Sequence, residues 1–207
     1  MKELLRHLFQ TDPSGLQERT LLDCHVQGVH SVVLYDTPGA RLRLFYATKN
    51  HGLYFHFPDF KDLPVGFHAH HCDVSLYVLN GILSNFTVSF ELPATGPCFN
   101  FNRYKYTSSI TNQKGSMEYV SKALTTIPKQ QQLNSGMTVY MNAKTIHTVR
   151  VESNFCIWAV MEGAEDSNYD NFLLTTRTLD ENSTKGLYNK PTMEQFNEMI
   201  LEMLNLL

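Results

Sequence analysis

One short segment, GFHAHHCDVSLYVLNG from Gly66 to Gly81, contains three of the nine histidines of the 207-residue chain and constrains the fold most strongly. Its β-branched, aromatic and aliphatic run from Val74 to Leu79 predicts a strand, and Gly81 predicts a turn at the end of that strand. Alternate residues of a strand point to opposite faces. One face then carries His68, His70, Cys72, Val74, Leu76 and Val78, and the other carries His71, Asp73, Ser75, Tyr77 and Leu79.

The face with His68 and His70 is expected to be buried, because its other members are mostly apolar. Burying two imidazoles costs free energy unless their nitrogens have partners. A divalent metal ion would supply a partner to both, so we interpret the two histidines as candidate metal ligands. The alternative is a pair of histidines at a barrel mouth that bonds the backbone or a ligand without metal.

Composition predicts one domain over residues 1–207, because 43% hydrophobic residues supply one sizeable core without disulfides. The net charge is -3 and the 17 basic residues are scattered along the chain. Neither nucleic acid nor a membrane surface is therefore an expected partner. We expect a small neutral or weakly charged ligand instead.

The N-terminal ten residues carry Lys2, Glu3, Arg6 and His7 among leucines, which is too polar for a signal-peptide core. No apolar run reaches membrane-spanning length. The four cysteines lack CxxC spacing, which favours reduced thiols over a disulfide framework or a structural zinc site. These features together predict a cytoplasmic protein.

Residues 1–10 and 14–27 have leucines at helical spacing and predict short N-terminal helices within residues 1–27. Residues 31–161 consist of short alternating runs separated by turns, which predicts an antiparallel sandwich or barrel. The expected strands are residues 31–35, 41–46, 51–57, 74–79, 82–92, 99–106, 118–128, 137–141, 146–151 and 155–161. Two hairpins are expected, one turning at residues 37–39 and one joining 82–92 to 99–106, and a glutamine-rich turn is expected to end at residues 134–136.

After this region, residues 164–190 lose the alternation and predict an irregular tail. Residues 192–207 then predict a helix, with Thr192 and Gln195 forming a capping box and an apolar stripe along one face. The stripe predicts packing onto the barrel or onto a partner subunit.

Two motifs carry a resemblance to a known family. The sequence His68-Ala69-His70 followed by Gly81, and Gly136 followed eleven positions later by His147, resemble the two motifs of the cupin superfamily. The resemblance spans about residues 31–161 and extends to bacterial cupin-like proteins of unassigned activity. It implies an all-β fold, a cupin-type antiparallel β-barrel (jelly roll) with short helices at both termini and a metal bound inside.

The match is incomplete, since the usual glutamate of the first motif is replaced by Val74, while Asn142 and Lys144 stand where cupins usually have proline and glycine. His147 shares a face with Val149 and Val151, so it is expected to point inward.

Three histidines without the glutamate resemble thiol dioxygenases, in which three neutral imidazoles hold ferrous iron. The resemblance implies metal ligands His68, His70 and His147, with Fe(II) favoured and Zn, Ni, Mn or Cu as alternatives. Three protein ligands leave open positions for substrate, as in catalytic sites.

A rival site consists of His71, Asp73 and His147, which match the 2-His-1-carboxylate pattern of 2-oxoglutarate oxygenases. Those enzymes usually need an arginine about ten residues beyond the last histidine, whereas here Arg150 and then Arg177 follow. Asp73 and His71 are also possible additions to the three-histidine site, Asp73 as a ligand or as an acceptor that orients a histidine.

The expected function is that of a metal-dependent oxidoreductase, a dioxygenase, acting on a small molecule in the barrel mouth. One alternative is a non-catalytic cupin that binds or senses a small molecule. A second is a metal-free isomerase or epimerase in which histidine and tyrosine transfer protons. A homodimer is expected, through paired sheet edges or exchanged terminal arms.

Overall fold

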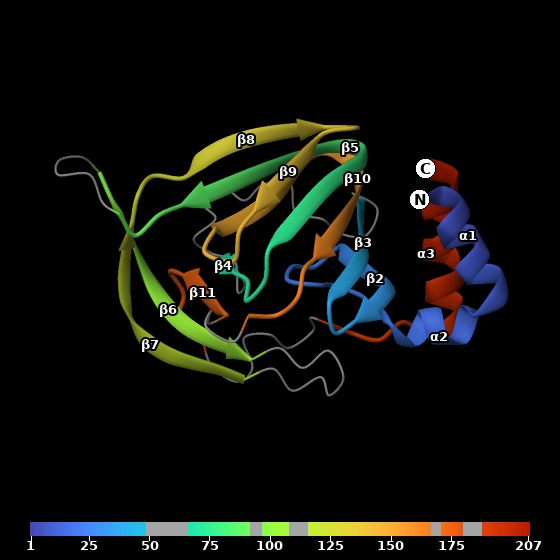
Figure 1. Ribbon diagram of the computed structural model, residues 1–207, viewed down its shortest axis with the longest axis horizontal. Helices are drawn as coiled ribbons and strands as arrows, with labels where there is room; N and C mark the ends of the chain where they lie inside the picture. Colours follow the sequence, from blue (N-terminus) through green and yellow to red (C-terminus); the bar gives the residue numbers. More distant parts are fainter. Residues whose placement is uncertain (49–65, 92–96, 108–115, 167–170, 180–187) are drawn as a thin grey trace.

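Antiparallel strands make up most of the protein, and its helices lie at the two ends of the chain (Figure 1). The computed structural model describes residues 1–48, 66–91, 97–107, 116–166, 171–179 and 188–207. The helices are α1 (Lys2–Thr11), α2 (Pro13–Glu18) and α3 (Met193–Leu206). The strands are β1 (Thr20–Leu21), β2 (Val29–Thr37), β3 (Ala40–Thr48), β4 (Phe67–Ala69), β5 (Val74–Val88), β6 (Phe99–Thr107), β7 (Ser116–Thr125), β8 (Lys129–Asn134), β9 (Thr138–Met141), β10 (Ile146–Glu162) and β11 (Phe172–Thr175). The predicted all-β fold with helices at both termini is confirmed.

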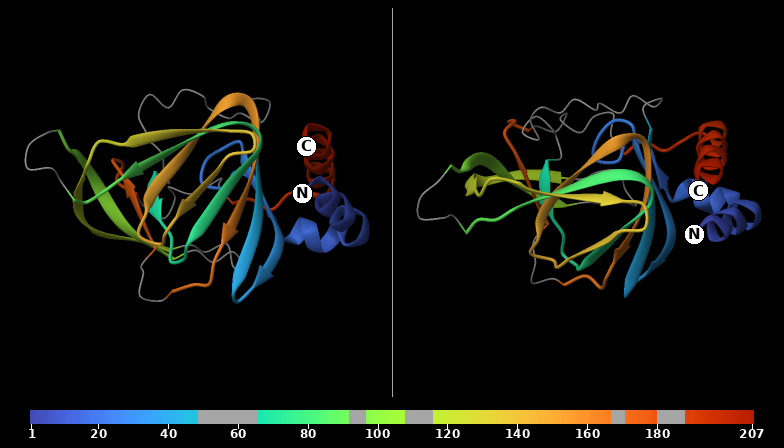
Figure 2. Two further views of the ribbon diagram at one scale, coloured as in Figure 1. Left: turned by 45° about the horizontal axis from the view of Figure 1, so that its top comes forward. Right: turned by 90° about the horizontal axis from the view of Figure 1, so that it is seen from above.

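The strands join into one curved sheet in the order β1-β2-β3-β10-β4-β11-β6-β7, and β5 adds a branch that pairs with β10, β8 and β9 (Figure 2). The two longest strands, β5 and β10, run antiparallel side by side along most of their length. Each of them has two further partners along its length. β10 pairs first with β4 and then with β3, and β5 pairs first with β9 and then with β8. This arrangement is compatible with a jelly roll, although the hydrogen-bonded path of the described strands does not close.

Gly81 marks a bend within β5 and does not end the strand, so the predicted turn there is wrong. Its φ of 96° lies in the left-handed region, and an added Cβ would overlap the carbonyl oxygen of Phe155 on β10. The register between β5 and β10 shifts at this point, as in a β-bulge. The glycine therefore lets one long strand curve around the core.

Several other sequence predictions are corrected by the pairing. The strand at residues 82–88 pairs with β8 and β10 and not with β6, so the second predicted hairpin is wrong. The glutamine-rich residues 129–134 form β8 and not a turn, with only Leu133 buried among exposed neighbours. The tail predicted as irregular contributes β11, whose short apolar run pairs with β4 and β6. The second helix ends at Glu18, far short of residue 27.

Other predictions hold. The hairpin of β2 and β3 turns at the predicted place, where the hydroxyl of Thr37 bonds the backbone of Ala40. The capping box of α3 has both of its hydrogen bonds, between Thr192 and Gln195. The predicted strand at residues 51–57 lies outside the described residues.

Two hydrophobic clusters lie on opposite faces of the strands β2, β3 and β10. The inner cluster includes Phe45 of β3 and Trp158 of β10 with the alternate residues of β5, as strand parity predicts. The outer cluster joins the same strands to the three helices, where Phe196 and Ile200 of α3 are fully buried. The helices therefore cover the outer face of the sheet, at the right of Figure 1, and the inner face is left to form the site.

Candidate metal centre

Adjacent strands place two of the predicted histidines directly opposite each other. His68 lies on β4, His147 lies near the start of β10, and they are register partners of this antiparallel pair. His70 follows the end of β4 by one residue, with the parity of His68. The alternate residues Phe67 and Ala69 pack into a separate hydrophobic cluster. The three imidazoles thus share the opposite side of these strands.

The three imidazoles converge on one point. Each offers one ring nitrogen, and these nitrogens lie within 4.8 Å of one another. The Nε2 atoms of His70 and His147 are 3.0 Å apart. Two nitrogens bound at right angles to one metal ion, each at about 2.1 Å, lie roughly 3 Å apart. The separation of this pair therefore fits joint coordination.

Hydrogen bonds on the far side of two rings orient them. The Nδ1 of His147 lies 2.9 Å from the Oδ1 of buried Asn85, whose amide nitrogen lies 3.6 Å from Met141 Sδ. The Nδ1 of His68 lies 3.3 Å from the carbonyl oxygen of Gly66. Because both oxygens accept, each Nδ1 carries the proton and each Nε2 keeps its lone pair. This is the tautomer that binds a metal through Nε2.

Burial keeps the cluster uncharged. It lowers the pKa of His68 well below the usual value, and the adjacent His147 lowers it further. Burial likewise lowers the pKa of His70 and of His147. The neighbouring imidazole of His68 lowers the pKa of His70 further, and that of His70 lowers the pKa of His147 further. Neutral imidazole is the form that coordinates metal.

Asp73 lies away from this cluster, as its strand parity predicts. One oxygen accepts from the hydroxyl of Tyr140, and the other accepts from the backbone amide of Ala143 at 3.0 Å. Asp73 therefore fastens the turn between β9 and β10. Val74, at the place of the usual cupin glutamate, is buried in the inner cluster.

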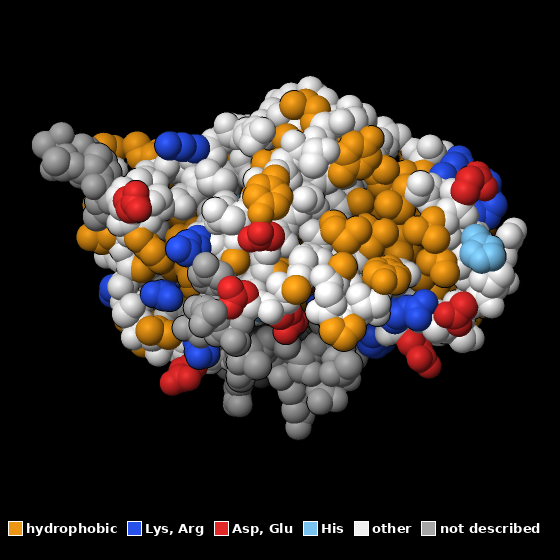
Figure 3. Space-filling view, viewed as in Figure 1, with side chains coloured by type: hydrophobic (Ala, Val, Ile, Leu, Met, Phe, Trp, Pro, Cys, Tyr) orange, Lys and Arg blue, Asp and Glu red, His pale blue; other side chains and the backbone are white. Residues whose placement is uncertain are grey.

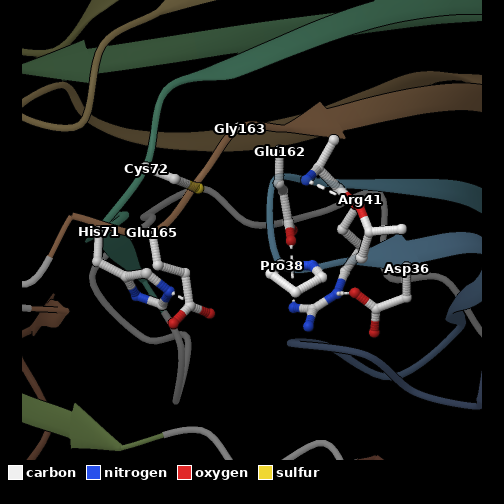
Figure 4. Close-up of a pocket in the computed structure, with 10 residues that line it drawn as sticks. Asp36, Pro38, Arg41, His71, Cys72, Glu162, Gly163 and Glu165 are labelled. Carbon is white, nitrogen blue, oxygen red and sulfur yellow. Dashed lines mark hydrogen bonds and ion pairs between the residues drawn. The ribbon is translucent and has the colours of Figure 1, made fainter.

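His71 lines a separate pocket of about 490 Å³ and pairs with Glu165, with 2.8 Å between Nε2 and Oε1 (Figure 4). Across this pocket Arg41 bonds Asp36 and Glu162. The rival triad is therefore not assembled, because His71, Asp73 and His147 each have different partners. The three-histidine group is the one potential metal cluster found among the described residues.

A buried arginine contributes positive charge near the cluster. The guanidinium of Arg43 bonds Ser31 at 3.1 Å, Cys24 at 3.3 Å and Glu162 at 3.4 Å, and it lies over the ring of Phe45. Its charge lowers the pKa of His68 and His70, although less than burial does. Sequence reasoning missed this residue and Asn85, because a polar residue within a strand gives no sign of which side chain it will meet.

An antiparallel β fold whose inner side presents three converging histidines is the class of architecture that the cupin resemblance implies. No protein-family model matches the sequence, and no curated protein matches it. No helix among the described residues is long and apolar enough to cross a membrane.

Solved structures are similar to part of this chain, at low sequence identity and low TM-scores. One is the hydroxypropylphosphonic acid epoxidase from S. wedmorenis, with 12% identity, a TM-score of 0.40, and 69% of this chain and 53% of that chain covered. An HTH_3 family transcriptional regulator from Vibrio cholerae shows 11% identity and a TM-score of 0.37, covering 75% of this chain and 61% of that one. A cupin superfamily protein from Desulfitobacterium hafniense DCB-2 shows 10% identity and a TM-score of 0.33, with 66% of this chain and 78% of that chain covered. The chain thus spans about half the length of the epoxidase, and the chemistry of the site rests on its own residues.

Proposed function

We propose that this protein binds one divalent metal ion through His68, His70 and His147 and acts as a metal-dependent oxidoreductase on a small molecule. The observation that supports it is the convergence of three neutral imidazoles whose ring nitrogens lie within 4.8 Å of one another. His147 is buried and His68 and His70 are half-buried, and close packing of three polar rings costs free energy unless their nitrogens have partners. A metal ion is a partner that all three can share.

The donor set is compatible with iron and disfavours manganese. Imidazole suits iron, zinc, nickel and copper, whereas manganese prefers oxygen ligands. Asp73 is bonded elsewhere, and the group of potential ligands among the described residues consists of three histidines without a carboxylate. Three neutral ligands leave the full positive charge of the ion uncompensated, which favours an anionic substrate that chelates it. We propose Fe(II) and a dioxygenase reaction on this basis.

The side chains of the protein have distinct tasks in this proposal. A bound iron(II) ion would supply redox chemistry with dioxygen. Asn85 and the Gly66 carbonyl hold the protons of His147 and His68 on Nδ1, so that Nε2 stays free. The rings of Phe45 and Trp158 stack with their centroids 5.3 Å apart in the inner hydrophobic cluster, which packs the sheet that carries the histidines.

The test begins with elemental analysis of protein purified without a histidine tag. Wild type should carry about one metal ion per chain after reconstitution with Fe(II) under anaerobic conditions, and His70→Ala and His147→Ala should carry almost none. His7→Ala, which removes an exposed histidine of α1, is the matched control. Wild-type protein that binds no metal would refute the proposal and favour a metal-free isomerase.

Oxygen consumption then tests the reaction class. The metal-loaded protein should consume oxygen with a member of a panel of small chelating anions, and the histidine variants should not. Metal binding without oxygen consumption across the panel would contradict the dioxygenase proposal and favour a binding or sensing protein.

A further inference from the structure

A fourth histidine, His25, lies against the three-histidine cluster. Its ring stacks on that of His68, with centroids 5.3 Å apart and an interplanar angle of 21°. The two residues are separated by more than forty positions and lie on different elements, since His25 belongs to the loop between β1 and β2. One face of a proposed ligand is therefore covered by a planar side chain.

The ring of His25 is itself held in place. Its Nδ1 is 2.8 Å from the hydroxyl of Tyr188, and the ring of Tyr188 meets it edge-on with centroids 5.6 Å apart. Tyr188 comes from the segment just before α3, so two distant parts of the chain fix one imidazole. His25 therefore links Tyr188 to His68 through direct side-chain contacts.

The backbone at this contact is unusual. Among the described residues, the non-glycine residues with positive φ are Asp23 at 54°, His25 at 71° and Tyr188 at 57°. Non-glycine residues rarely adopt this conformation, which is strained for a residue with a side chain. Tyr188 bonds both Asp23 and His25, so the backbone strain is concentrated around the loop that positions His25.

Hydrogen bonds hold the strained loop. The amide of Tyr188 donates to the carbonyl of Asp23 at 3.1 Å, and a carboxylate oxygen of Asp23 accepts from the amide of Gly28 at 2.8 Å. The amide of Cys24 also donates to the carbonyl of Val29, at 2.6 Å. These bonds leave His25 little freedom to move away from His68.

We infer that His25 is a positioning residue of the proposed metal centre, which fixes the ring plane of His68, with Tyr188 fixing His25 in turn. The inference rests on the proposed function, because it concerns the orientation of a proposed ligand. A flat, clamped ring restricts rotation of the His68 imidazole and so favours the orientation in which Nε2 points to the other two histidines. Residues that orient a ligand without touching the metal typically change metal affinity by about 10- to 100-fold.

The experiment compares His25→Ala, His25→Phe and Tyr188→Phe with wild type, using Co(II) as a spectroscopic probe. Co(II) affinity and the visible absorption spectrum are measured by titration of metal-free protein. His25→Ala removes the stacked ring and should weaken Co(II) binding about 10- to 100-fold and change the spectrum. His25→Phe keeps a stacked ring without the bond to Tyr188 and should lose less. Tyr188→Phe should give a smaller loss and the same direction of spectral change.

Controls separate the two levels of the proposal. His7→Ala should match wild type, and His147→Ala should abolish binding. Wild type and His147→Ala binding Co(II) equally would refute the metal centre itself. The inference alone would be refuted if wild type binds Co(II), His147→Ala does not, and His25→Ala has the affinity and spectrum of wild type.

Misfolding of His25→Ala, judged by circular dichroism, leaves the decision to the two phenylalanine variants. A wild-type spectrum and affinity in both of these would likewise refute the inference.

Discussion

His68 and His147 are register partners on β4 and β10, so the backbone pairing itself places two of the three imidazoles side by side. Directly opposed residues of an antiparallel pair project to the same face. The site therefore depends on a strand only three residues long, which β11 supports from its other edge. A change in the pairing of β4 would displace His68 and His70 together.

Asn85→Ala should weaken metal binding while leaving its stoichiometry at one. The amide oxygen of Asn85 accepts from Nδ1 of His147 at 2.9 Å. Without this hydrogen bond the imidazole of His147 can rotate and change tautomer. A loss of about 10- to 100-fold in affinity is expected, far less than for His147→Ala. Competition with a chromogenic chelator measures the difference, and an unchanged affinity would show that His147 needs no such orientation.

Gly81→Ala should destabilise the fold, because the residue combines a φ of 96° with a close approach to Phe155. Gly136→Ala tests the conformational cost by itself, since its φ is 87° and no atom lies within 4 Å of an added Cβ. Gly39→Ala is the control, with open space and no positive φ.

Urea unfolding should show the largest loss in the free energy of unfolding for Gly81→Ala, a smaller loss for Gly136→Ala and the smallest for Gly39→Ala. The Gly136 variant should lose about 1 kcal/mol. A Gly81 variant as stable as the Gly39 variant would mean that β5 bends without the glycine.

The sequence predicted the parts of the fold that follow strand periodicity. The inward parity of Val74, Leu76 and Val78 and the outward parity of Asp73 follow directly from alternation, and the structure confirms both. The hairpin of β2 and β3 follows from its turn residues, and α3 follows from its capping box. These features are local, so sequence patterns carry them.

Features that depend on distant partners could not be predicted in the same way. β8 has a single buried side chain, Leu133, so its sequence lacks the alternation that marks a strand. β11 is too short to show a period and is defined by its pairing with β4 and β6. His25 meets His68 only through the folded loop, and a lone histidine beside a cysteine gives no sign of that contact.

The metal-free protein should lose stability as pH falls below about 6.5. Burial lowers the pKa of His25 to about 4 and lowers those of His68, His70 and His147 well below their usual value. Between the folded and unfolded pKa values, the unfolded chain binds the extra protons, so acid favours unfolding. Each such histidine adds up to about 1.4 kcal/mol of lost stability per pH unit.

Urea unfolding at a series of pH values from 7.5 to 5 measures this slope. His147→Gln removes one of the buried titrating groups and should show a shallower slope than wild type, whereas His7→Gln should not. Equal slopes in all three proteins would show that His147 is not held neutral by burial.

The expected homodimer remains a prediction, and the exposed apolar residues of the sheet suggest where to test it. Hydrophobic side chains gather on one face over β3, β5 and β10, beside the helices (Figure 3). Exposed apolar residues of the described strands include Tyr77 of β5, Tyr140 of β9 and Met161 of β10. Large exposed apolar surfaces commonly mark interfaces.

Light scattering at micromolar concentration should therefore give a dimer mass for wild type and a monomer mass for Met161→Glu. Val120→Glu, which places the same charge on the exposed side of β7, is the control. A monomer mass for wild type would count against the dimer.

Asp73→Ala distinguishes an all-histidine centre from one that contains a carboxylate. Asp73 bonds Tyr140 and the amide of Ala143 and so stabilises the turn into β10. Its loss should lower the free energy of unfolding by about 1 kcal/mol while most of the metal stays bound. His70→Ala should instead empty the site, because it removes one of three ligands.

Metal stoichiometry after dialysis against a weak chelator compares the two variants, with urea unfolding as the check on stability. Tyr140→Phe is the matched control, since it removes one bond to Asp73 and keeps the carboxylate. An Asp73→Ala protein as empty as His70→Ala, beside a loaded Tyr140→Phe, would show that the carboxylate reaches the ion. The centre would then be of the two-histidine, one-carboxylate kind, and the turn into β10 would have to open when metal binds.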